Sequence, residues 1–187
     1  MKGGTISTVA SLLMKTARRS MRHKQLHESN GQRTHAVVLE TGEEVMECLQ
    51  KFAVAEGIHS AQLTAIGAFS EVTLLYFDWA RKEYLRIPVR EQVEVASLIG
   101  DIAEAPSGGP ALQIHLVIGK RDGMAMAGHL GEARVRPTLE VIVTESPAHL
   151  RKLKDAETGL ALIHPEAQHE QDRTHHLGHP RRIYSEP

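Results

Sequence analysis

The stretch LQIHLVIGKRDGMAMAGHLGEARVRPTLEVIVTE, residues 112–145, predicts a β-hairpin followed by a third strand. Its two halves are rich in β-branched and apolar residues, and KRDGM lies between them. Gly123 suits the left-handed position that closes a loop of three residues, 121–123. The loop length matters because a slip of one residue moves every side chain to the other face of the sheet.

A three-residue loop pairs Lys120 with Met124, and counting outward from that pair sets His115 opposite His129. Directly opposed residues share one face of a sheet, with Cβ atoms about 4.5–5.5 Å apart. The two imidazoles are therefore expected side by side, where they could share a metal ion or line one pocket. A two- or four-residue loop would place them on opposite faces and remove both possibilities.

Glu140 is the third candidate for this site. Its neighbours Leu139 and Val141 are apolar and project to the opposite face. A buried glutamate needs a partner, which the histidine pair, Arg136 or a bound ion would supply. Two histidines and a carboxylate suit zinc or another divalent metal, and they equally suit a hydrogen-bonded cluster without an ion.

The remaining pattern predicts an α+β domain whose mainly antiparallel sheet carries one principal helix. Residues 41–57 favour the helix, with Thr41 and Glu44 as a capping box and Gly57 as its end. Its apolar stripe is expected to face the core. The gaps between most predicted strands are too short for parallel crossovers. These strands are 34–40, 60–70, 72–79, 83–89, 93–103, 111–119, 123–130 and 133–145, and residues 146–153 resemble a helical turn.

The two ends of the chain differ in composition from this domain. Residues 1–32 are expected to form a flexible basic arm, whose Arg18, Arg19 and Arg22 could contact DNA phosphates. The alternatives are a frayed helix, or a true start at Met21. Residues 33–163 form the predicted domain, and residues 164–187 are a histidine-rich tail expected to be disordered.

Composition excludes several classes of protein. The 187 residues carry a formal net charge of −1, so no global field attracts nucleic acid or anionic membrane. No apolar run approaches the roughly 20 residues that span a bilayer. A single cysteine, Cys48, rules out an internal disulfide framework and favours a cytoplasmic protein. It falls within the helix stripe, and no nucleophile–base–orienter set is visible, so no catalytic residue is assigned.

In combination, the helix, the AIGAFS strand (65–70), the hairpin ending in GHL (128–130) and the strand with Glu140 resemble the PPC domain, the plants-and-prokaryotes-conserved domain. The resemblance implies a homotrimer with an α+β fold. Some bacterial members carry a metal at histidines in a pattern like H-x-H…GGH. On this chain the last two histidines match His115 and His129, and the first falls on Gln113. Plant members also carry AT-hooks that bind DNA, which this sequence lacks.

Three functions follow from these observations. The first is a cytoplasmic, trimeric binding or assembly module, with a small ligand or a metal in a pocket around Gln113, His115, His129 and Glu140. The second is a DNA-binding regulator that uses the basic arm. The third is a metal-dependent hydrolase or lyase with Glu140 as general base.

Overall fold

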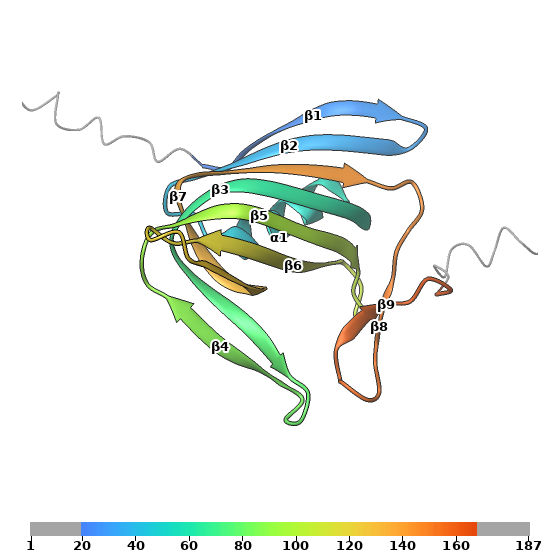
Figure 1. Cartoon of the computed structure of the whole chain (residues 1–187). Helices are drawn as coiled ribbons and strands as arrows, with labels where there is room; N and C mark the ends of the chain where they lie inside the picture. The colour runs from blue at the N-terminus through green and yellow to red at the C-terminus, as the bar shows by residue number, and fades with distance from the viewer. Residues whose placement is uncertain (1–19, 168–187) are drawn as a thin grey trace, which may run out of the picture.

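The computed structural model describes residues 20–167 and confirms the α+β fold with a mainly antiparallel sheet. Seven strands pair in the order β1-β2-β7-β6-β5-β3-β4, and a separate hairpin joins β8 to β9. Figure 1 shows the sheet curling strongly around its core. The strands are β1 (Arg22–Ser29), β2 (Gln32–Glu40), β3 (Ser60–Asp78), β4 (Glu83–Val89), β5 (Val93–Glu104), β6 (Pro110–Gly119), β7 (Ala125–Glu145), β8 (Lys152–Lys154) and β9 (Ala161–Ile163), and the helix is α1 (Val45–Glu56).

Two long strands close the sheet on itself. The strands predicted at 60–70 and 72–79 are one strand, β3, and those predicted at 123–130 and 133–145 are one strand, β7. β7 pairs with β2, β3 and β6, so β3, β5, β6 and β7 form a closed ring of pairings. Gly67 permits the close approach of β3 to β7, because a Cβ atom there would lie 2.3 Å from the carbonyl oxygen of Thr138.

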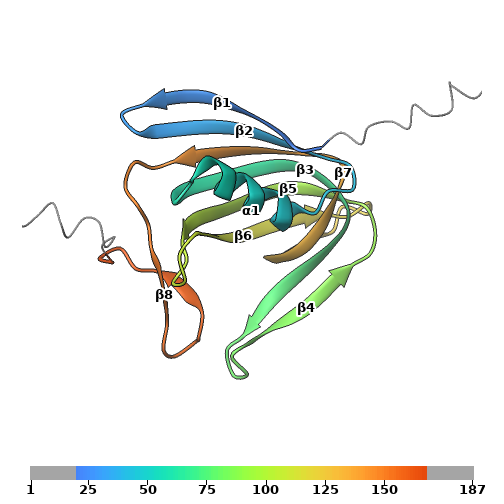
Figure 2. The ribbon, with the colours of Figure 1, turned by 180° about the vertical axis from the view of Figure 1, so that it is seen from behind.

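Helix α1 lies against the inner face of the sheet, as Figure 2 shows from behind. Val45, Leu49, Phe52 and Ala53 are buried, which confirms the predicted apolar stripe. Gly57 ends the helix in the left-handed conformation, as expected. The predicted cap was wrong, since Glu44, three residues after Thr41, accepts the capping hydrogen bond from the backbone N–H of Glu47.

Two segments differ from the sequence expectation. Residues 22–29, assigned to the flexible arm, form β1 and pair with β2. The turn between them is Asn30-Gly31, with φ values of 51° and 78°, which suits a two-residue hairpin. Residues 146–153 form no helical turn, and β8 begins at Lys152 instead. In the described part of the chain, no helix is long and apolar enough to cross a membrane.

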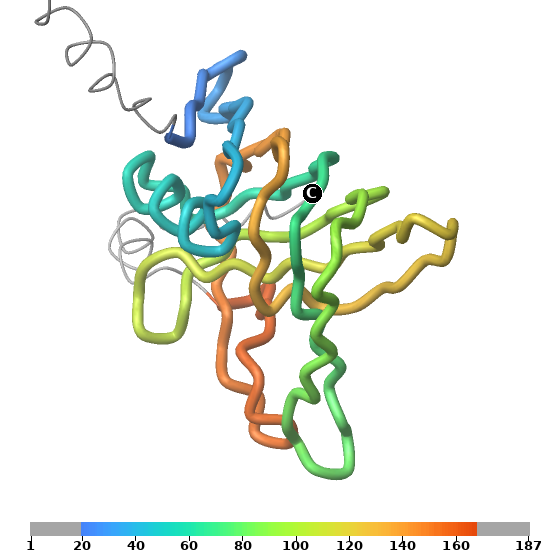
Figure 3. Tube along the Cα trace, turned by 90° about the vertical axis from the view of Figure 1, so that its left-hand side faces the viewer, coloured from blue at the N-terminus to red at the C-terminus, as the bar shows by residue number. Residues whose placement is uncertain are grey.

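Two hairpins, β3–β4 and β8–β9, extend from one end of the curved sheet (Figures 1 and 3). The pKa of Asp155, beyond β8, is lowered first by hydrogen bonds from Thr158 and also by the positive charge of Lys82, between β3 and β4. The outer face of β5, β6 and β7 between these hairpins carries the candidate site.

Candidate functional site

The predicted hairpin register is confirmed. The backbone N–H of Lys120 donates to the carbonyl of Met124 at 2.8 Å, and His115 lies directly opposite His129. Nε2 of His115 and Nδ1 of His129 are 3.4 Å apart, and the two rings meet edge to face with their centroids 5.1 Å apart. The pair is therefore one unit on the outer face of β6 and β7.

A tyrosine from the β3–β4 hairpin extends this unit. The ring of Tyr84 stacks on His129, with centroids 5.1 Å apart and an interplanar angle of 29°. His129 is half-buried, and its pKa is lowered, first by desolvation and then by the charges of His115 and Lys152. The pKa of a histidine is ordinarily about 6.5, and that of His129 is lower, so its imidazole is neutral at pH 7. A neutral imidazole can donate one hydrogen bond and accept another.

Lys152, at the start of β8, is a buried cation beside the histidine pair. Its side chain is 2% exposed, and Nζ lies 2.6 Å from a carboxylate oxygen of Asp101 on β5. Nζ also donates to the amide oxygen of Gln113 on β6, at 3.4 Å. Asp101 lies directly opposite Gln113 in the sheet, so one cross-strand pair holds the ammonium.

These groups surround a small pocket of about 150 Å³, which we call the hairpin pocket. One part of its wall is polar and the other is apolar. It opens to solvent and lies between β6, β7 and the two projecting hairpins. The lining residues are Tyr84, Ala111, Leu112, Gln113, His129, Lys152, Leu160, Ala161 and Leu162.

Glu140 lies apart from the histidine pair. His115 is opposite Ile99, Ile99 is opposite Thr64, and Thr64 is opposite Ile142. At about 4.8 Å per strand, Ile142 is roughly 14 Å from His115, and Glu140 is two residues farther along β7. Within one chain its exposed carboxylate is therefore too far away to contact the imidazoles. It lies instead in a shallow depression lined by apolar side chains.

The residues do not complete the metal site that the family resemblance implies. Two nitrogen ligands of one zinc ion are about 3.3 Å apart, so the 3.4 Å between His115 and His129 would suit two of them. The amide oxygen of Gln113, however, accepts a hydrogen bond from Lys152. The positive charge of the Lys152 ammonium would also repel a metal cation bound beside it. Among residues 20–167, no group of three or more His, Cys, Asp and Glu side chains could hold a metal ion.

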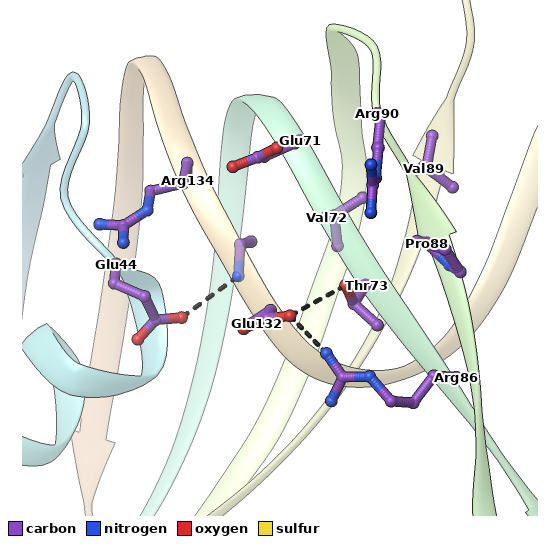
Figure 4. Close-up of a pocket in the computed structure, with 11 residues that line it drawn as sticks. Glu44, Glu71, Val72, Thr73, Arg86, Pro88, Val89, Arg90, Glu132 and Arg134 are labelled. Atoms are coloured by element: carbon purple, nitrogen blue, oxygen red, sulfur yellow. Dashed lines mark hydrogen bonds and ion pairs between the residues drawn. The ribbon is translucent and has the colours of Figure 1, made fainter.

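A larger cleft, of about 390 Å³, lies between β3, β4 and β7 (Figure 4). Its charges are largely satisfied within the protein. Arg86 forms an ion pair with Glu132, which also accepts from Thr73. Glu44 accepts from the backbone N–H of Ala133. Its walls carry three arginines and three glutamates, so this cleft has no net charge that would select a ligand.

The other sequence candidates do not add to the site. Arg18 and Arg19 lie outside the described residues. Arg22 begins β1 and forms an ion pair with Glu40 at 2.8 Å, so its charge is partly neutralised. Cys48 is half-buried on α1, and burial raises its pKa to about 11, which leaves an unreactive thiol.

Sequence reasoning found the histidines and Gln113 but missed Lys152, Asp101 and Tyr84. Asp101 had a detectable signal, because an aspartate within the apolar run VASLIGDIA needs a partner. Lys152 had no such signal, since a lysine among the polar residues after β7 is expected to be exposed to solvent. They come together only because the segment before β8 returns to the end of β5, where Arg151 bridges to Glu104.

These features define a small α+β domain with a closed antiparallel sheet and a polar pocket beside a histidine hairpin. The chain belongs to the Plants and Prokaryotes Conserved (PCC) domain family, also written PPC, which matches residues 26–147. This confirms the resemblance seen in the sequence.

Solved structures of proteins from several organisms share the fold of this chain. A candidate DNA-binding protein from Bacteroides thetaiotaomicron is 26% identical with a TM-score of 0.70, and the match covers 78% of this chain and 99% of that one. A metal-containing protein from Archaeoglobus fulgidus is 32% identical with a TM-score of 0.64, covering 70% and 91%. A PPC protein from Pyrococcus horikoshii is 28% identical with a TM-score of 0.67, covering 76% and 100%. None of the curated proteins compared with the chain matches it.

Proposed function

We propose that this chain is a homotrimeric binding module of the cytoplasm whose hairpin pocket takes a small ligand. The observation that carries the proposal is the convergence of His129, Gln113 and the buried Lys152 at one pocket, with His115 in contact with His129. Pockets that combine an apolar wall with a few convergent polar groups are the usual ligand sites of proteins. The described residues offer no activated nucleophile beside them, so binding without chemistry fits the site better than catalysis.

An NMR screen of small polar metabolites tests this proposal. A true ligand should shift the ring signals of His129 and Tyr84 saturably. Ala111→Phe, which fills the pocket, should abolish the shifts, whereas Val54→Glu on the exposed side of α1 should keep them. If no compound shifts these rings, or if Ala111→Phe leaves the shifts intact, the proposal is wrong.

The homotrimer rests on an exposed apolar surface, the outer apolar face, formed by Ile66, Ile99, Val117 and Ile142. These side chains lie on β3, β5, β6 and β7, and Ile66 and Ile99 are 62% and 58% exposed. An apolar surface of this kind marks an interface more often than a free surface. Ile99→Glu should therefore dissociate the trimer in sedimentation equilibrium. Val54→Glu, at a residue 60% exposed on α1, should not. A wild-type chain that sediments as a monomer would refute the assembly.

A divalent metal such as zinc is a second candidate occupant. The 3.4 Å between the imidazole nitrogens of His115 and His129 favours it, and one related protein is described as metal-containing. If zinc occupies the site, metal analysis should find more zinc in the wild type than in the His115→Ala/His129→Ala double variant. Equal contents would exclude it, and the comparison cancels any zinc held elsewhere in the chain. A hydrolase or lyase that uses Glu140 as base would need that carboxylate beside the metal, where the chain does not place it.

DNA binding is the remaining alternative. Related proteins from Bacteroides thetaiotaomicron and Ralstonia eutropha are described as candidate DNA-binding proteins, which supports it weakly. A trimer would display the basic arm three times and could raise avidity. Deletion of residues 1–19, which spares β1, should then abolish retention on duplex DNA at low salt. Unchanged retention would count against the arm as the DNA-binding element.

A further inference from the structure

The ammonium of Lys152 has an unused hydrogen-bond donor. A lysine ammonium carries three N–H donors. Among the described residues, it donates a hydrogen bond to the amide oxygen of Gln113, at 3.4 Å, and forms an ion pair with one oxygen of Asp101, at 2.6 Å. The side chain is almost fully buried, and a buried donor without an acceptor is costly. Because Lys152 lines the hairpin pocket, an acceptor for its third N–H can come from a ligand in that pocket.

The lining of the hairpin pocket favours an anionic group over a cationic one. Lys152 is its one charged lining residue, and Gln113, His129 and Tyr84 add neutral groups that can donate hydrogen bonds. Asp101, which forms the ion pair with the ammonium, is not part of the lining. It neutralises the buried charge without presenting its carboxylate to the ligand.

The rest of the lining and the size of the pocket restrict the ligand further. The remaining lining residues are apolar: Ala111, Leu112, Leu160, Ala161 and Leu162. The pocket volume of about 150 Å³ is less than half that of the cleft between β3, β4 and β7, about 390 Å³, so it suits a small ligand. Inorganic phosphate is small but would place charged oxygens against the apolar lining.

We infer that the hairpin pocket binds a short aliphatic monocarboxylate, with the carboxylate at Lys152 and Gln113 and the alkyl chain against Leu160 and Leu162. This inference rests on the proposed function, since it names the ligand class of the same pocket. The ammonium of Lys152 then fills the role of the cation in a site that lacks a third metal ligand. A charge-assisted hydrogen bond of this kind discriminates strongly between an anion and a neutral isostere.

The test titrates full-length protein with sodium propionate, propionamide and inorganic phosphate, and follows the methyl signals of Leu160 and Leu162. Propionate should bind saturably and at least tenfold more tightly than propionamide or phosphate. Lys152→Met should weaken propionate binding at least tenfold. Lys154→Met, which removes the same charge from the exposed part of β8, should leave it unchanged.

The outcomes separate this inference from the proposed function. Equal affinity for propionate and propionamide, or unchanged binding in Lys152→Met, overturns the carboxylate assignment but leaves a ligand pocket. Zinc held by His115 and His129 with no saturable propionate binding also overturns it. The comparison of propionate with propionamide uses the wild-type chain alone, so it decides the matter even if Lys152→Met fails to fold. If the wider metabolite screen also finds no ligand at the pocket, the proposed function fails too.

Discussion

Replacing Lys152 with methionine should destabilise the protein by about 2 kcal/mol. Methionine keeps most of the apolar stem, so the packing of this side chain is largely preserved. The loss comes from Asp101, whose carboxylate would remain without the ammonium that now lies 2.6 Å away. Breaking a fully buried ion pair costs about 3–5 kcal/mol. The side chain of Asp101 is 29% exposed, so water can partly replace the ammonium and the cost is smaller.

The double variant Lys152→Met/Asp101→Asn should recover most of this loss. Removing both charges avoids an uncompensated ion, and such pairs can often be replaced with little cost. We therefore expect the double variant to lie within about 1 kcal/mol of the wild type, which makes the coupling energy of the pair measurable as a double-mutant cycle.

Urea unfolding at one fixed protein concentration is the suitable assay, because the proposed trimer would make apparent stability depend on concentration. For a chain of this size, about 2 kcal/mol corresponds to a fall in Tm of about 4–8 °C. A single variant within about 0.5 kcal/mol of the wild type would refute the reasoning, since the ion pair would then contribute no more than an exposed one. A double variant no more stable than the single one would refute it as well.

Three further predictions concern the core and the sheet. Desolvation lowers the pKa of buried His35, so the unfolded chain binds the proton more readily. The stability that neutral His35 contributes should be fully present above about pH 6.5, and the free energy of unfolding should decrease as the pH falls below that value. In equilibrium unfolding, His35→Leu should show a weaker decrease over the same pH range. Burial raises the pKa of Cys48 to about 11, so iodoacetamide should alkylate the folded protein at pH 8 at least about tenfold more slowly than the unfolded chain, and equal rates would contradict the burial. Gly67→Ala should cost about 3 kcal/mol or more, because the added Cβ would meet the backbone of Thr138, whereas Gly108→Ala, with open space around it, should cost about 1 kcal/mol in thermal unfolding.

Local signals in the sequence were enough to predict the hairpin. Gly123 limits the loop to three residues, and the register follows from that length alone, so the meeting of His115 and His129 was predictable. The turn Asn30-Gly31 is an equally local signal, but β1, the strand that precedes it, has Leu26 as its one apolar residue and is exposed along its whole length. Patterning of apolar residues predicts strands that bury one face, and β1 buries neither.

The rest of the site depends on contacts between segments far apart in the chain. Lys152 lies 51 positions after Asp101, and nothing local to either residue indicates that the segment before β8 returns to the end of β5. The separation of Glu140 from His115 has the same cause. Strands that are consecutive in the sequence need not be neighbours in space, and β5 and β3 separate β6 from the C-terminal half of β7. The bend that allows β7 to pair with β6 at one end and with β3 at the other cannot be read from alternation alone.

Nitrogen NMR of the Lys152 side chain tests the central claim most directly, because it observes the buried cation beside the histidine hairpin. The account predicts an ammonium signal protected from hydrogen exchange, absent in Lys152→Met, which moves saturably when propionate is added. A rapidly exchanging signal like that of an exposed lysine, or one that propionate leaves unchanged, would contradict it.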